Sequence, residues 1–176
     1  MNFDVNMCLL RTPEISVISV IYGLDFSSWK RAAVCQCFPD VRVVFIASAD
    51  DVPAGGVLVV WGMKQIVGKL ALDVKILRLE DGFLRSVGLG VDLTRPMSWV
   101  VDSRGIYYDA TRPSDLEHLL AETVFRQEMI ARAAILRERI VAEGLTKYNI
   151  GVAGWQRPSG VGKVILVPGQ DRKSVV

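Results

Sequence analysis

The chain has 176 residues, 51% hydrophobic and 23% charged, which suffices for one globular domain with a sizeable core. A net charge of +2 gives no case for general nucleic-acid binding, and a single histidine argues against a histidine-based zinc site. Three cysteines without CxxC or metal spacing favour a reducing cytoplasm over a disulfide framework. The apolar run at 15–22 is far shorter than the ~20 residues of a membrane span, and no long apolar run follows a basic start. We therefore expect a soluble, cytoplasmic protein, with peripheral association at the inner membrane left open.

In the first half of the chain, runs rich in Val and Ile alternate with segments of helical spacing. Strands are expected at residues 14–22, 41–47, 57–61 and 74–79, and helices at 26–38 and 64–72. Continuous apolar strands that alternate with helices are typical of a parallel sheet covered on both faces. The predicted fold class is therefore α/β with a parallel sheet.

The pattern changes after residue 79. Short strands are expected at residues 97–101, 106–108 and 163–167, the first two joined as a hairpin by the turn at 102–105. Ser114 and Glu117 have the spacing of a capping box, which predicts that a helix begins there. Apolar residues at helical spacing continue that helix until Gly144 ends it.

Glu80, Asp81 and Gly82 directly follow the strand expected at 74–79. Loops at the carboxyl ends of strands are where open α/β sheets bind ligands. Two interpretations stay open: an ordinary acidic turn, which is common after a strand, or a general base or ligand clamp made of adjacent carboxylates. Spacing alone favours the turn.

Arg85 and Ser86 lie a few residues further on. An arginine fork can bind a phosphate or carboxylate, and it can equally form a salt bridge to Glu80 or Asp81 that holds the loop. Tyr107 and Tyr108 offer stacking faces and hydroxyl groups that suit a sugar, although an edge strand packed on a helix explains them as well. Gly88 and Gly90 lack the third glycine of a dinucleotide fingerprint.

Ordered motifs extend from about residue 22 to residue 170. They lie at 60–62, 78–86, 100–102, 105–110, 114–120, 147–149 and 167–170. In these motifs the chain closely resembles the capsule-polysaccharide biosynthesis and export family of Gram-negative bacteria. Members of that family are β-Kdo glycosyltransferases, where Kdo is 3-deoxy-D-manno-oct-2-ulosonic acid.

The resemblance implies a two-domain GT-B-like glycosyltransferase, of which this chain is the Rossmann-like N-terminal half. It implies transfer of Kdo from CMP-Kdo, with retention of configuration, to a phospholipid-linked Kdo acceptor, with no metal and no cofactor beyond the donor substrate. The implied partners are capsule assembly and export proteins. On this basis the candidate substrate-binding residues are Glu80, Asp81, Gly82, Arg85, Ser86, Tyr108 and Gln170.

The chain departs from the family pattern after Gln170. The family continues with Val-Glu-Asp-Asp-Ala-Ser, whereas here the sequence runs through Asp171 to an ending of different composition. The catalytic aspartate of the family is expected in that acidic run, and Asp171 is not in register with it, so no catalytic residue is assigned. We expect one Rossmann-like domain over residues 1–170, an atypical tail over 171–176 and no second half. The chain would then be an inactive fragment; a naturally short homologue with its own ending is the alternative.

Two rival functions remain from the sequence. One is a non-catalytic binding or scaffold component of capsule polysaccharide export. The other is a small nucleotide-binding α/β domain unrelated to capsules, which the glycines at 88 and 90 neither support nor exclude.

Overall fold

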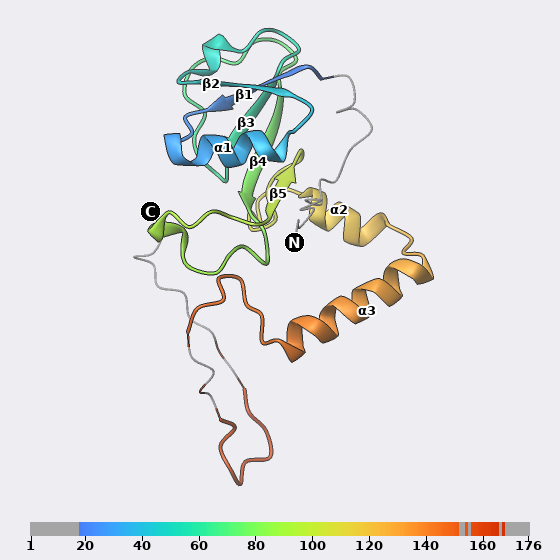
Figure 1. Cartoon of the computed structure of the whole chain (residues 1–176). Helices are drawn as coiled ribbons and strands as arrows, with labels where there is room; N and C mark the ends of the chain where they lie inside the picture. Colours follow the sequence, from blue (N-terminus) through green and yellow to red (C-terminus); the bar gives the residue numbers. More distant parts are fainter. Residues whose placement is uncertain (1–17, 152–153, 155, 166, 168–176) are drawn as a thin grey trace.

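The computed structural model describes residues 18–151, 154, 156–165 and 167, which fold around one five-stranded sheet (Figure 1). The strands are β1 (Val20–Leu24), β2 (Arg42–Ile46), β3 (Val57–Trp61), β4 (Lys75–Asp81) and β5 (Trp99–Asp102), in the order β2-β1-β3-β4-β5. The first four strands are parallel, and this confirms the predicted α/β class. The edge strand β5 is antiparallel to β4, because residues 82–98 return the chain at the same end of the sheet without a crossover helix.

Helix α1 (Ser28–Cys37) covers one face of the sheet, as the sequence predicts for 26–38. Val34 and Cys37 of this helix are fully buried and pack with Ile21, Val59 and Leu79 from the strands. Since β3 has four buried residues in a row, both of its faces are covered. The apolar run at 57–61 is thus the central strand of the core.

The other face of the sheet is covered by loops. The helix expected at 64–72 is absent, and the segment is irregular. Its backbone bonds to the short 3-10 helix η2 (Ala49–Asp51) instead: Val67 O accepts from Ala49 N at 2.7 Å, and Lys69 N donates to Asp50 Oδ1 at 3.0 Å. Gly68 has a φ of +95°, which a helix does not allow. Tertiary hydrogen bonds therefore override the helical spacing.

Two other strand predictions are wrong. Residues 106–108 form no strand, because the carboxylate of Asp102 accepts hydrogen bonds from the backbone of Arg104 and Gly105 and turns the chain out of the sheet. No strand forms in the described part of 163–167. The first strand begins at Val20 and continues through Gly23 to Leu24, later than expected, while 14–17 lie outside the described residues.

The helix predicted from Ser114 begins there but is divided into two, α2 (Asp115–Glu122) and α3 (Gln127–Ala142). Ser114 and Glu117 form the predicted capping box, and Gly144, with a φ of +61°, follows the end of α3. Neither helix contains a buried residue, and α3 lies apart from the sheet in Figure 1. In the part of the chain that the structure describes, no helix has the length and apolar character needed to cross a membrane.

Candidate functional site

The carboxyl ends of β1, β3 and β4 meet at one edge of the sheet. The chain goes from β1 outward to β2 and then returns to β3 on the other side of β1, which is the switch in strand order beside which α/β sheets bind ligands. Asp25, Gly62 and Gly82 follow the three strand ends. Lys64 joins two of these ends, since its ammonium group donates to Asp25 O at 3.1 Å and pairs with the Asp25 carboxylate.

The sequence predicts Glu80 and Asp81 in the loop after a strand, whereas both are the last residues of β4. Asp81 forms a largely buried ion pair with Arg85 of the loop that follows. Nε of Arg85 lies 2.7 Å from Oδ2 of Asp81, and the two side chains are 2% and 15% exposed. The N–H is not aligned for a hydrogen bond, and Oδ1 of Asp81 is buried without a partner among the described residues, so charge attraction dominates the contact. Of the two roles open to Arg85, the structure contains the salt bridge; ligand binding by Arg85 stays a prediction.

Ser86 completes the bracing of this loop. Its hydroxyl accepts from Arg85 Nη1 at 2.9 Å and donates to Gly88 O at 2.7 Å. Gly90 leaves room for the arginine, because a Cβ there would lie 3.1 Å from Arg85 Nη2. Gly90 thus serves the packing of Arg85, while Gly88 has a φ of +108° and lies against Thr94, so a nucleotide is not needed to explain either glycine.

The loop is also tied to a distant motif at 147–149. Arg85 N and Ser86 N donate to Lys147 O at 2.8 and 3.3 Å, and Gly88 N donates to Tyr148 O at 2.8 Å. The side chain of Asn149 donates to Ser86 O at 2.9 Å. Two segments that sequence analysis singled out separately are therefore one structural unit.

Gly82 permits a close approach of the chain to itself. A Cβ at this position would lie 2.1 Å from Ser98 Oγ, and Gly82 N donates to Ser98 O at 3.0 Å. Ser98, which directly precedes β5, fills the space that the missing side chain of Gly82 leaves. Gln170, the last candidate from the sequence, lies outside the described residues.

Glu80 and Tyr108 meet beside the end of β3. The hydroxyl of Tyr108 donates to Glu80 Oε2 at 3.2 Å, while Glu80 Oε1 accepts from the backbone of Asp81 at 2.9 Å. A Cβ at Gly62 would lie 2.5 Å from the same hydroxyl, so glycine makes the contact possible. Burial of the phenol group, followed by the charge of Glu80, raises the pKa of Tyr108 to about 12. Tyr108 thus stays protonated and can donate at neutral pH.

Three aromatic rings form a group next to these polar atoms. Tyr107 lies between Phe83 and Tyr108, with ring centroids 5.0 and 5.3 Å apart. Phe83 is 56% and Tyr108 49% exposed. Burial raises the pKa of Tyr107, whose hydroxyl contacts Asp81 O at 3.5 Å. Exposed rings beside a carboxylate and a hydroxyl match the apolar faces and polar edges of a sugar.

Lys30 is a member of the site that sequence analysis missed. Its ammonium group lies 3.4 Å from the centroid of the Trp61 ring, and burial lowers its pKa although Asp81 and Glu80 oppose the shift. Lys30 lies on α1, fifty positions before the acidic loop, so only the packing of α1 on the sheet reveals the contact. Within the described residues, no group of three His, Cys, Asp or Glu side chains is placed to hold a metal ion.

Residues 57–157 match the family model described as "Capsule polysaccharide biosynthesis protein", and the chain belongs to that family. This confirms the resemblance found in the sequence motifs. Among curated relatives, the capsule polysaccharide modification protein LipA of Neisseria meningitidis is 36% identical over 160 residues, covering 85% of this chain and 23% of LipA. The lipopolysaccharide-processing protein LpsZ of Rhizobium meliloti is 37% identical over 184 residues, covering 93% of this chain and 41% of LpsZ. The chain thus spans well under half the length of both.

Two solved structures share the fold. The β-Kdo 2,4 transferase of Thermosulfurimonas dismutans KpsC superposes with a TM-score of 0.62 at 34% identity, covering 79% of this chain and 46% of that one. The β-Kdo 2,7 transferase of the same KpsC gives a TM-score of 0.57 at 32% identity, covering 70% and 43%. These similarities confirm the predicted likeness to a GT-B-like glycosyltransferase half.

Proposed function

We propose that this chain provides the Rossmann-like N-terminal half of a retaining β-Kdo transferase of capsule biosynthesis and that the carboxyl end of its sheet binds sugar. The donor would be CMP-Kdo, and the acceptor a phospholipid-linked Kdo chain. The observation that carries the proposal is the hydrogen bond between Tyr108 and Glu80 beside the exposed rings of Phe83 and Tyr108. Membership of the family and the likeness to two Kdo transferases support it.

In this site each group has a role that its chemistry suits. The Glu80 carboxylate accepts from sugar hydroxyls, and the Tyr108 oxygen, whose proton is donated to Glu80, can accept from another sugar hydroxyl. The rings of Phe83 and Tyr108 cover an apolar sugar face. Asp81 and Arg85 hold the loop in shape from beneath, because their ion pair and its hydrogen bonds are buried.

No residue of this chain is assigned the transfer step. The chain covers 46% or less of either KpsC transferase, and groups of the remaining part of such an enzyme would supply the catalysis. We therefore expect no measurable Kdo transfer from residues 1–176 alone. Association with capsule assembly and export proteins at the cytoplasmic face of the inner membrane belongs to the same proposal.

A non-catalytic role in capsule export is the second candidate. The observation that favours it is α3, which has no buried residue and exposes Ile135 at 60% and Val141 at 74%. Exposed apolar side chains gathered on one element are typical of a surface that binds another protein. The two candidates differ in whether the chain recognises Kdo.

Isothermal titration calorimetry of the chain with a synthetic β-Kdo glycoside, with CMP-Kdo and with a neutral hexose tests the proposal. We expect saturable binding of at least one Kdo compound and none of the hexose. In Glu80→Gln and Tyr108→Ala the affinity should fall, while Tyr22→Phe, on the strand β1, serves as the control. Absence of saturable heat for both Kdo compounds, with a folded protein by circular dichroism, would favour the export role.

A further inference from the structure

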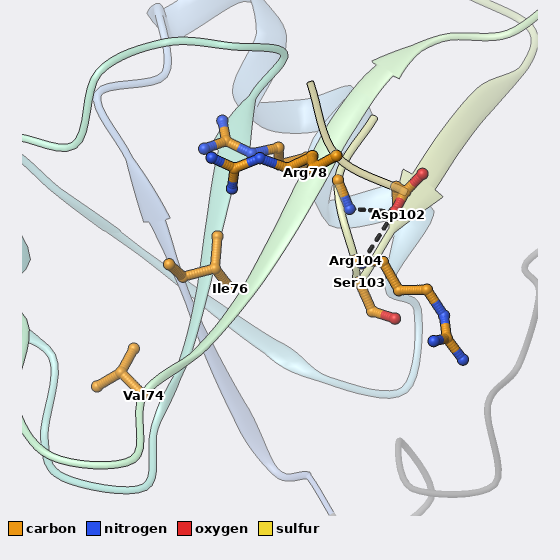
Figure 2. Close-up of a pocket in the computed structure, with 8 residues that line it drawn as sticks. Val74, Ile76, Arg78, Asp102, Ser103 and Arg104 are labelled. Carbon is orange, nitrogen blue, oxygen red and sulfur yellow. Dashed lines mark hydrogen bonds between the residues drawn. The ribbon is translucent and has the colours of Figure 1, made fainter. Parts of the chain in front are cut away.

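We propose that a cavity beside β4 is an anion-binding site anchored by Arg78, which takes the carboxylate or phosphate group of an acidic ligand. The cavity has a volume of about 200 Å³ and lies between β4 and the turn that follows β5 (Figure 2). Its lining includes Val74, Ile76, Arg78, Asp102, Arg104 and Arg112.

Arg78 is the arginine of the cavity whose charge is not compensated by an ion pair. Arg104 pairs with Asp115 at 3.0 Å and Arg112 with Asp109 at 3.5 Å. Among the described residues no carboxylate lies within ion-pair distance of Arg78; its Nη1 donates to the backbone oxygen of Gly62 at 2.6 Å.

The two acids near Arg78, Asp109 and Asp102, have their closest contacts with other groups. Asp109 acts on it only at longer range, and hydrogen bonds from Thr111 come first among the causes that lower the pKa of Asp109. Asp102 accepts from the backbone of Arg104, Gly105 and Asp115 at 2.8 to 3.1 Å. A half-buried guanidinium group without an ion-pair partner among the described residues favours an external anion.

The geometry of the cavity selects Arg78 as the anchor. Figure 2 shows Val74 and Ile76 on one side and Asp102 to Arg104 on the other, with the guanidinium groups of Arg78 and Arg104 pointing apart. The apolar side reduces contact with water and so strengthens the attraction of an anion. Among the described residues, one donor atom of Arg78 is occupied by protein, which leaves other N–H groups to hold two oxygens of a planar or tetrahedral anion.

The cavity adjoins the candidate sugar site. Arg78 and Glu80 are two residues apart on β4 and so project from the same face of the sheet. Gly62 joins the two sites, because its oxygen accepts from Arg78 and its Cα faces the contact of Tyr108 with Glu80. An acidic sugar or a sugar phosphate could place its anion on Arg78 and its hydroxyl groups at Glu80. This assignment of the ligand rests on the proposed function, whereas the anion site does not.

Titration of the ¹⁵N-labelled chain, followed by amide chemical shifts at constant ionic strength, tests the proposal. The probes are inorganic phosphate, free Kdo and a neutral hexose. We expect saturable shifts at Arg78 and Ser103 with phosphate, with Kdo or with both, and none with the hexose. Arg78→Gln should weaken the binding at least about tenfold, whereas Arg104→Gln should change it less than about twofold.

Thermal melts show whether each variant is folded. If Arg78→Gln is unfolded, Arg78→Lys takes its place in the titration. Lysine keeps the charge but loses the fork, so weaker binding with an intact fold supports the site. Unchanged affinity in the folded Arg78 variant, or no saturable shift with either anion, overturns it. If the chain binds phosphate but not Kdo, the anion site stands and the acidic sugar is excluded as its ligand. A failure of the proposed function can therefore be told apart from a failure of the anion site.

Discussion

Arg85 is held against Asp81 in the interior of the loop that follows β4, with Nε 2.7 Å from Oδ2 and only 2% of the arginine side chain exposed. The ion pair joins this loop to the end of β4, where Glu80 lies, and the loop bonds through Arg85 N to Lys147 O. We expect a side chain so buried to influence a ligand mainly through the shape of the loop.

Replacement of Arg85 should mainly reduce stability. Arg85→Gln leaves the buried carboxylate of Asp81 without a counter-charge, and we expect unfolding to become easier by about 3 kcal/mol or more. Arg85→Lys keeps the charge but loses the contact with Ser86, and should give a smaller loss. The control is Arg104→Gln, which breaks a half-exposed ion pair and should cost at most about 1 kcal/mol. Urea unfolding followed by circular dichroism measures all three; equal losses in Arg85→Gln and Arg104→Gln would contradict the bracing role.

Tyr108 should titrate late. Its pKa in the folded chain is about 12, against about 10 in the unfolded chain. Above pH 10 the unfolded state loses the proton first, so the contribution of Tyr108 to stability is complete below pH 10 and disappears as the pH rises through 12. An ultraviolet titration of the four tyrosines should contain an ionisation step near the pKa of Tyr108, and this step should be missing in Tyr108→Phe. In Glu80→Gln that step should move to lower pH, and an unchanged curve would exclude the contact.

Gly62 should not tolerate a side chain. It has a φ of +48°, and a Cβ would lie 2.5 Å from the Tyr108 hydroxyl and 2.8 Å from Glu80 Oε2. The control is Gly55→Ala, at a φ of +70° with nothing within 4 Å of the new Cβ. Both changes carry the strain of a left-handed conformation, about 1–2 kcal/mol. The additional loss of stability in Gly62→Ala measures the clash of the new Cβ with Tyr108 and Glu80. Equal melting temperatures for the two variants would mean that Tyr108 and Glu80 move aside freely.

Asp102 should act as an anchor for the start of α2. Its Oδ1 accepts from Arg104 N and Gly105 N, and its Oδ2 accepts from Asp115 N. Asp102→Asn places an N–H₂ group against one of these donors, and we expect a loss of about 1–3 kcal/mol. The control is Asp73→Asn, at an exposed turn position with a φ of +55° that asparagine also adopts, and it should change stability by less than about 0.5 kcal/mol. Chemical denaturation of both variants makes the comparison, and similar midpoints would refute the anchoring role.

The strands and caps were predictable because local pattern determines them. The apolar runs at 57–61 and 74–79 are β3 and β4, and Ser114 caps α2 through its own neighbour Glu117. The helix expected at 64–72 failed because its backbone bonds to η2, and the hairpin failed because a side chain, Asp102, took the hydrogen bonds of the turn. The first competitor lies 19 positions away and the second is a side chain of the turn itself, and neither leaves a periodic signal.

The site was predictable in part. Glu80 and Asp81 lie at the carboxyl end of a strand, close to where the sequence predicts them, and the salt bridge was one of two roles open to Arg85. The contact of Lys30 with Trp61 and the cavity at Arg78 arise from packing between elements far apart in the sequence. Sequence spacing carries no information about either.

The central claim, that the end of β4 recognises the Kdo unit of a capsule precursor, is tested most directly by mapping a bound β-Kdo glycoside on the ¹⁵N- and ¹³C-labelled chain. We expect saturable shifts in the amide of Glu80 and in the ring signals of Phe83 and Tyr108, and we expect Tyr108→Ala to lose them while it keeps its fold. Saturable binding with shifts confined to other parts of the chain, or identical binding by Tyr108→Ala, would contradict it.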